Sequence, residues 1–217
     1  DVFLTLGRTD DALTQFQDGL KISRVLSEVD PHDAQKQRDL MISHYKLGDV
    51  QVQAGRFDQA HGLFTEGIAV LDGMIAQGQS VKQSQQEKAL LEQRRQFCTV
   101  AKLATGDWDT LLKADAKVLP QLLLLRATEM LKRGELAHAV TAADKLREGT
   151  PKDKNNLYNA ACLYARCAEF VTKVKPAPTD AEQAERQKLL NLAIDCLKES
   201  LAAGWDDQFF FENTQRV

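Results

Sequence analysis

The segment from His44 to Leu71 constrains the fold more than any other part of the chain, because it has the pattern of two helices joined by one tight turn. Gly55 ends the first helical pattern, and the second begins at Phe57. Small residues stand where the two helices would touch, and bulky residues flank them. The small residues are Gly48, Ala60 and Gly67, and the bulky residues are Leu47, Phe57, Leu63 and Phe64. The segment therefore predicts a close-packed helical hairpin.

The same spacing of small and aromatic residues occurs upstream, which predicts a repeat architecture. The upstream copy consists of Gly7, Ala12, Phe16 and Gly19. These residues match Gly55, Ala60, Phe64 and Gly67 in spacing. The copies start at positions 7 and 55, so the period is 48 residues. Pro31 forces a turn within this length, between long helices expected at about 9–29 and 33–54. We expect Asp33 to cap the second of these helices.

The composition favours a helical protein and argues against a nucleic-acid partner. Hydrophobic residues make up 43% and charged residues 27%, as in ordinary soluble proteins. Only five prolines occur, and good helix formers dominate. The 28 basic and 31 acidic residues give a net charge of −3, whereas a nucleic-acid partner normally requires a basic stripe. No apolar run approaches the roughly 20 residues that span a bilayer, so we expect no membrane segment here.

Downstream of the hairpin the pattern becomes irregular. A helix is expected at about 80–104, after the one at 57–76, and a degenerate copy of the turn follows at Gly106. Leu111 replaces the small residue of the other copies, and Pro120 shortens the second helix. We therefore expect a joint in the array between Gly106 and Pro120.

A repeat of standard length and a broken last unit complete the chain. The small and terminal positions of the standard repeat hold Ala127, Ala139 and Pro151. In the last unit, which begins at Leu157, two prolines within residues 173–180 interrupt the helical pattern. A closing helix is expected at about 180–203. Residues 204–217 are expected to cover the open end of the array, because a repeat buries its faces only against neighbours.

These spacings resemble the tetratricopeptide repeat (TPR) over nearly the whole chain. The resemblance implies an all-α fold, an α-α right-handed superhelix of TPR-like helical hairpins in a single array. Its units would be residues 1–40 (partial), 41–79, 80–119 (degenerate), 120–153 and 154–203, with a C-terminal cap at 204–217.

Several segments resemble, more narrowly, the long repeats that follow the kinase domain in many bacterial eukaryotic-type Ser/Thr protein kinases. They are Asp30–Pro31, Gln37–Leu40, Ser43–Asp49, Tyr158–Tyr164 and, together with Leu197, Ala203–Asp206. The resemblance implies a non-catalytic protein–protein interaction module, a regulatory part of a larger bacterial signalling protein. The alternative is a structural module whose repeats stack end to end to oligomerise a parent protein. The chain starts at Asp1 without a methionine, and we expect a fragment of a longer protein.

In TPR proteins the first helix of each hairpin lines a concave groove that binds peptides. The resemblance places Ile42, Tyr45, Asp49, Val52 and Gln53 in that groove, and in the last repeat Asn155, Tyr158, Cys162, Ala165 and Arg166. Chaperone-binding members clamp a carboxylate with Lys and Asn, whereas this chain has Tyr45 and Asp49, so we expect no such clamp. Two tyrosines with an Asn and an Arg would suit a mixed apolar and polar peptide. The other interpretation is that these residues pack only against the neighbouring helix.

No residue pattern predicts catalysis, a cofactor or a metal site. The sequence contains no kinase phosphate loop or catalytic loop. Glu135 and His138 have the i, i+3 spacing of di-iron helices, but such a site needs two pairs, so we expect a surface pair. The polar span 79–96 is expected to be a solvated helix face. Phe209–Phe211 is expected to pack within the cap and not to form an exposed patch.

The four cysteines indicate a reducing compartment. They are Cys98, Cys162, Cys167 and Cys196, and no two of them form a Cys-x-x-Cys pair. All lie among apolar residues in expected helices, so we expect buried free thiols and a cytoplasmic location. Cys162 and Cys167 should face different sides of one helix, because five residues turn it by about 500°.

Overall fold

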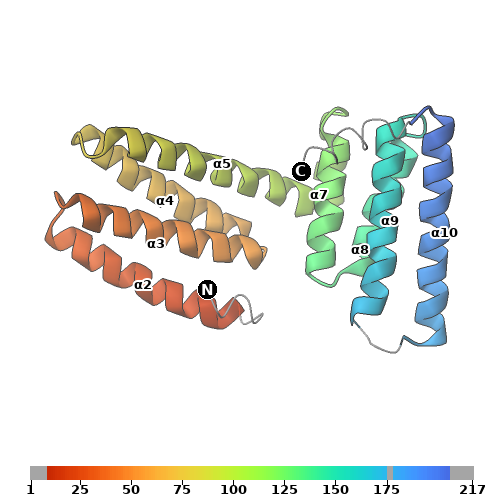
Figure 1. Cartoon of the computed structure of the whole chain (residues 1–217), viewed down its shortest axis with the longest axis horizontal. Coiled ribbons are helices and arrows are strands. Elements are labelled where there is room, and N and C mark those ends of the chain that lie inside the picture. Colours follow the sequence, from red (N-terminus) through yellow and green to blue (C-terminus); the bar gives the residue numbers. More distant parts are fainter. Residues whose placement is uncertain (1–8, 175–177, 206–217) are drawn as a thin grey trace, which may run out of the picture. The chain divides into compact units, whose positions relative to one another are not determined.

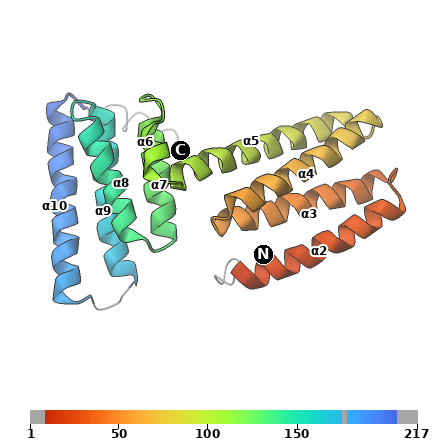
Figure 2. The same cartoon turned by 180° about the vertical axis from the view of Figure 1, so that it is seen from behind.

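The computed structural model describes residues 9–174 and 178–205. Every regular element in this part of the chain is an α-helix, and consecutive helices pack on one another, so the predicted all-α fold is confirmed. The chain forms two compact units, with the boundary after Lys102. Figure 1 and Figure 2 show the helices of both units. The helices are α2 (Thr9–Val29), α3 (Ala34–Gln53), α4 (Phe57–Ala76), α5 (Val81–Thr105), α6 (Trp108–Leu112), α7 (Leu119–Lys132), α8 (Leu136–Gly149), α9 (Lys154–Val174) and α10 (Asp180–Ala202).

The predicted division into repeats stays a prediction. The boundary between the two units lies close to the joint expected between Gly106 and Pro120. The turn at Gly7 and the expected cap from Asp206 onward, with Phe209–Phe211, lie outside the described residues. Among the helices that are described, none combines the length and the apolar character that crossing a membrane requires.

In the first unit, α2 packs along α3 and α3 packs along α4 (Figure 1). The last helix, α5, contacts both α3 and α4. Arg38 of α3 lies 3.3 Å from Glu87 of α5, and the ring of Phe57 in α4 meets Phe97 of α5 edge-on at 6.3 Å. An apolar core between α2, α3 and α4 holds the unit together. Its buried residues are Ala12, Leu13, Leu20, Leu40, Leu47 and Val50, with Phe16, Leu63 and Val70 packed against them.

Two glycines let the helices of the first unit approach closely, and the contact at Gly48 is the one that the spacing predicted, between α3 and α4. A Cβ added at Gly48 of α3 would lie 2.6 Å from Cε1 of Phe64, whose side chain is fully buried in α4. A Cβ at Gly67 of α4 would lie 2.6 Å from Cδ2 of Leu91 in α5. Gly19, the matching residue of the upstream copy, has no atom within 4 Å of such a Cβ. The similarity between the two copies therefore does not extend to this contact.

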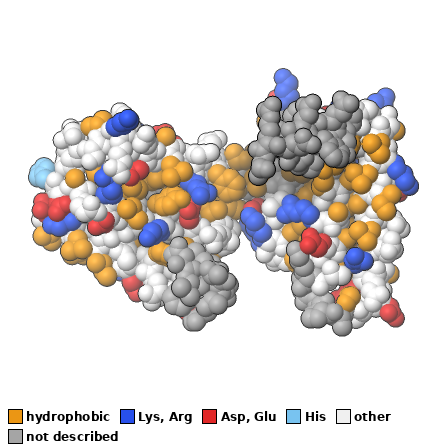
Figure 3. Space-filling model, in the orientation of Figure 1, with side chains coloured by type: hydrophobic (Ala, Val, Ile, Leu, Met, Phe, Trp, Pro, Cys, Tyr) orange, Lys and Arg blue, Asp and Glu red, His pale blue; other side chains and the backbone are white. Residues whose placement is uncertain are grey.

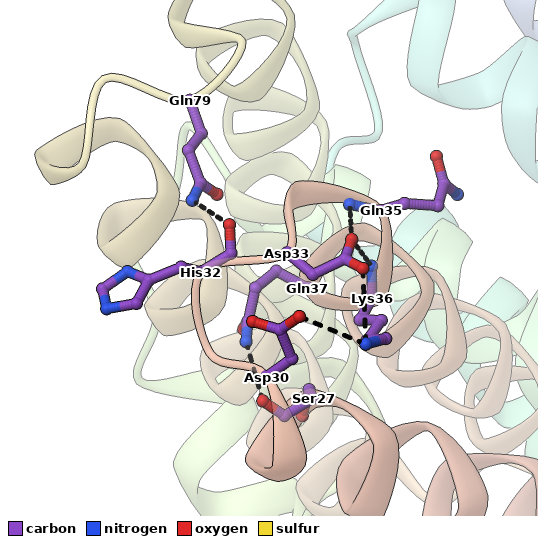
Figure 4. A network of polar contacts seen from close by, with 8 residues as sticks. All are labelled: Ser27, Asp30, His32, Asp33, Gln35, Lys36, Gln37 and Gln79. Carbon is purple, nitrogen blue, oxygen red and sulfur yellow. Dashed lines mark hydrogen bonds and ion pairs between the residues drawn. The ribbon is translucent and has the colours of Figure 1, made fainter.

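A polar network holds the turn between α2 and α3 (Figure 4). Asp33 caps α3 as predicted, because its Oδ1 accepts hydrogen bonds from two amides of the first turn, at 2.9 and 3.1 Å. Nζ of Lys36 lies 3.4 Å from carboxylate oxygens of both Asp30 and Asp33. Nε2 of Gln79 donates to the carbonyl of His32 at 2.9 Å, which ties this turn to the one between α4 and α5.

In the second unit a short α6 precedes four longer helices, of which α7 packs on α8, α8 on α9 and α9 on α10. The five residues of α6 confirm a short helix at the degenerate turn, but the helix ends at Leu112, before Pro120. Pro120 stands in the first turn of α7, where its missing amide hydrogen costs no helical bond. A capping box of Thr179 and Glu182 begins α10.

Candidate functional site

Five of the predicted groove residues lie on α3 in the first unit, and two of them contact α5. Oδ1 of Asp49 lies 3.6 Å from Nε of Arg94. The polar interaction with the Tyr45 hydroxyl, followed by the charge of the Asp49 carboxylate, raises the pKa of Arg94. The Tyr45 ring also packs on Phe64, with ring centroids 6.4 Å apart. Tyr45, Asp49 and Arg94 therefore form one half-buried group, which we call the α3–α5 cluster.

The other predicted residues of α3 differ in exposure, since Ile42 and Val52 are half-buried and Gln53 is exposed. Arg94 was not singled out from the sequence, because it falls in the span 79–96 that was expected to be solvated. That expectation is correct for one face of α5 only. Its other face carries Leu91, which is 1% exposed, and the contacts to α3 and α4. The many polar residues of α5 led to the expectation of a solvated helix, although a few apolar residues form a buried face.

The predicted residues of the last unit lie on α9. The Tyr158 ring stacks on Trp205, with centroids 4.6 Å apart and an angle of 10° between the planes. Nη1 of Arg166 donates to Oγ1 of Thr128 in α7 at 3.1 Å. Asn155 is exposed in the first turn of the helix. A ligand at Tyr158 would therefore also touch or displace Trp205.

Three of the four cysteines are buried as predicted, and the prediction is wrong for Cys162, which is exposed. Burial raises the pKa of the Cys98 and Cys196 thiols to about 11 and that of Cys167 to about 12. These thiols stay protonated near neutral pH and are poor nucleophiles. The exposure of Cys162 and the burial of Cys167 confirm that the two face different sides of α9.

The Glu135–His138 pair is a surface contact. Nδ1 of His138 lies 2.9 Å from Oε2 of Glu135, and the side chains are 58% and 41% exposed. A helical di-iron site requires carboxylates from facing helices in addition to such a pair. Within residues 9–174 and 178–205, no group of three or more His, Cys, Asp or Glu side chains is arranged to hold a metal ion.

Sequence reasoning missed Arg126, the charged residue that organises the degenerate turn. Its side chain is buried, and Nη1 donates to the carbonyls of Ala104 at 2.9 Å and Gly106 at 2.7 Å. The guanidinium lies 3.9 Å from the centroid of the Trp108 ring, a cation–π contact. Arg126 thus satisfies carbonyls at the end of α5 that lack a helical donor. The signal in the sequence was a single arginine inside a leucine-rich run.

A cleft of about 440 Å³ in the second unit was also not predicted. It is lined by Asp144, Arg147, Glu148, Pro151, Tyr164, Leu192 and Glu199. The Tyr164 hydroxyl donates to Oδ1 of Asp144 at 2.6 Å, and burial together with this bond raises the pKa of Tyr164. Arg147 donates to both oxygens of Glu199, at 2.5 and 3.3 Å. These bonds join α8 to α9 and α10, so four of the lining side chains are already paired with one another.

The α3–α5 cluster combines an aromatic ring, a carboxylate and a guanidinium at a partly exposed surface. Such a surface offers a polypeptide both hydrogen bonds and an aromatic contact, and interfaces are enriched in tyrosine and arginine. Comparison of the sequence with protein-family models and with curated proteins finds no match.

Proposed function

We propose that this chain is a non-catalytic protein-binding module, a scaffold of TPR-like hairpins that serves as a regulatory part of a larger bacterial signalling protein. The proposal rests on the resemblance of its repeat spacings. The observation that carries it is the α3–α5 cluster, in which two groove residues expected from the sequence, Tyr45 and Asp49, share one partly exposed surface with Arg94. The net charge of −3 favours a protein or peptide over a nucleic acid as the partner.

The cluster can exchange its own contacts for those of a ligand at low cost. The side chains of Arg94 and Asp49 are 41% and 26% exposed. An ion pair at such a surface contributes on the order of 0–1 kcal/mol to stability. A peptide carboxylate or amide can therefore take the place of Asp49 on Arg94 while the Tyr45 ring contributes apolar area. A segment with mixed polar and apolar side chains fits this surface.

An Arg94→Gln variant tests the proposal, with Lys102→Gln as a matched control. Both substitutions remove one positive charge from α5, but Lys102 is paired with Asp58 of α4, at 2.7 Å, and lies outside the cluster. In quantitative pull-downs we expect the control to retain the partner and Arg94→Gln to recover at least about tenfold less, which corresponds to about 1.4 kcal/mol. Thermal melts of both variants verify folding. Equal recovery by the two variants would count against the cluster.

The location that we propose is the cytoplasm. Cys98, Cys167 and Cys196 are free thiols buried in the two units. Free buried cysteines are typical of reducing compartments. Labelling of intact and lysed cells with a membrane-impermeant thiol reagent tests this, since the exposed Cys162 should react only after lysis.

A second candidate function is a structural module that oligomerises its parent protein. The observation that favours it is the exposure of four large apolar side chains on α2, at residues 22, 25, 26 and 29. Large exposed apolar patches mark interaction surfaces in soluble proteins.

A further inference from the structure

The outer face of α2 exposes an apolar stripe near the C-terminal end of the helix. Ile22 is 62% exposed, Val25 59%, Leu26 50% and Val29 77%. These positions follow the i, i+3, i+4, i+7 spacing of one helix face, and at 100° per residue they span about 100° of the helix surface. Figure 3 shows hydrophobic side chains along the lower left edge of the view, where α2 lies in Figure 1. We call this surface the α2 stripe.

The inner face of the same half of α2 is small and polar. Oγ of Ser23 lies 2.8 Å from Oγ of Ser43 in α3. Ser27 is 4% exposed, and its carbonyl accepts a hydrogen bond from Nε2 of Gln37 at 3.2 Å. A surface helix normally turns its apolar residues toward the core and its polar residues toward water. Here the order is reversed, so the α2 stripe is adapted to burial against a surface outside this unit.

The stripe is held in place before any partner binds. The turn that follows it is fixed by the polar network of Figure 4. Arg24 reaches from α2 to Glu66 of α4, with 3.1 Å between Nη2 and Oε2. A surface whose backbone is already ordered loses little conformational entropy on association.

The charges beside the stripe complement those of a second copy of this chain. Lys21 and Glu28 are seven residues apart, so they lie two turns apart on the same side of the stripe. When two such helices pair antiparallel, each flank meets the same flank of the other copy in reverse, and Lys21 comes opposite Glu28 of the second copy. The two-fold symmetry produces this pair twice. Parallel pairing would instead place Lys21 beside the opposite flank, which carries Ser23.

We propose that the α2 stripe binds the α2 stripe of a second copy of this chain, antiparallel about a two-fold axis near Val25. Ile22 then meets Val29 of the second copy, and Val25 and Leu26 lie at the centre. Lys21 is free to take part, because its contact with Asp18 is an exposed pair, at 2.9 Å. The proposal deepens the second candidate function and does not depend on the α3–α5 cluster. Four apolar side chains per copy form a small interface, so the dimer is a weak, reversible one.

The experiment is sedimentation equilibrium on the 217-residue chain from about 5 µM to about 1 mM, a range suited to weak association. We expect the mass to rise with concentration from 24.2 kDa toward twice that value. Val25→Glu places two carboxylates near the axis and should raise the dissociation constant at least about tenfold. Leu197→Glu on α10, where the leucine is 37% exposed, is the matched control and should leave the dissociation constant unchanged. Circular dichroism verifies that both variants fold.

Charge reversal tests the antiparallel register. Lys21→Glu and Glu28→Lys should each weaken the dimer about three- to tenfold, because like charges then face each other twice. The double variant should return to within about twofold of the original dissociation constant, since the pairs are restored with opposite sign. A monomer at all concentrations, a mass above the dimer, a dimer unaffected by Val25→Glu, or no rescue in the double variant would each overturn the proposal.

Discussion

Replacing Gly48 by alanine tests the close contact between α3 and α4. The added Cβ would lie 2.6, 2.9 and 3.0 Å from Cε1, Cζ and Cδ1 of Phe64. The Phe64 ring is fully buried and packs on Tyr45, so it cannot turn aside without disturbing its neighbours. Overpacking of this kind costs about 1–3 kcal/mol.

A gain in helix propensity opposes this cost, and a second glycine isolates that gain. Gly73 lies exposed in α4, and a Cβ there would have no atom within 4 Å. Alanine is favoured over glycine in a helix by roughly 0.5–1 kcal/mol. We therefore expect Gly73→Ala to raise the free energy of unfolding by about that amount. Gly48→Ala should lower it by about 0–2 kcal/mol, because the clash outweighs the same gain.

Urea denaturation followed by circular dichroism measures both variants in the same unit of the protein. The quantity that tests the reasoning is the difference between them, which we expect to be about 1–3 kcal/mol. Replacing the Phe64 ring by the smaller leucine side chain in the Gly48→Ala background should relieve the clash. The effects of the two substitutions on the free energy of unfolding should therefore couple by at least about 0.5 kcal/mol. Equal stability of Gly48→Ala and Gly73→Ala would refute the close contact.

Three further predictions concern other groups. Arg126→Ala should lower the free energy of unfolding by about 2–4 kcal/mol, because two backbone carbonyls and the Trp108 ring lose their contact with the guanidinium. The Trp108 fluorescence should also shift to the red, and an unchanged emission would contradict this prediction. Burial lowers the pKa of His44 below 6.5, so the unfolded chain binds the proton first and stability falls as the pH drops through 6.5 toward the folded-state pKa. Urea midpoints at about pH 7.5 and about pH 5.5 should show this loss in the original chain and less of it in His44→Gln, and identical losses would exclude His44 as the cause. A disulfide reagent should modify one thiol per native chain and none in Cys162→Ser, whereas rapid reaction of a second thiol would conflict with the burial of Cys98, Cys167 and Cys196.

Features that act over a few residues could be predicted from the sequence. Asp33 caps α3 because its carboxylate reaches amides only two and three positions away. The break before Phe57 was predictable because Gly55 adopts a φ of 70°, a conformation that other residues rarely take. The contact at Gly48 also followed from local pattern, since two long helices joined by a short turn must pack against each other. The residues of the α3–α5 cluster were predictable only on α3, because Arg94 comes from a separate helix.

The sequence by itself therefore determined the long helices, the Asp33 cap and the hairpin at Gly48, because each depends on neighbours close in the chain. Only the tertiary structure decided which side of each helix is covered. It buries Arg126 against the carbonyls that end α5, and it leaves Cys162 in solvent on the outer side of α9. On α2, local pattern would turn Ile22 and its apolar neighbours inward. The structure turns Ser23 inward instead, because contacts from α3 and the fixed turn after α2 set the rotation of the helix about its axis.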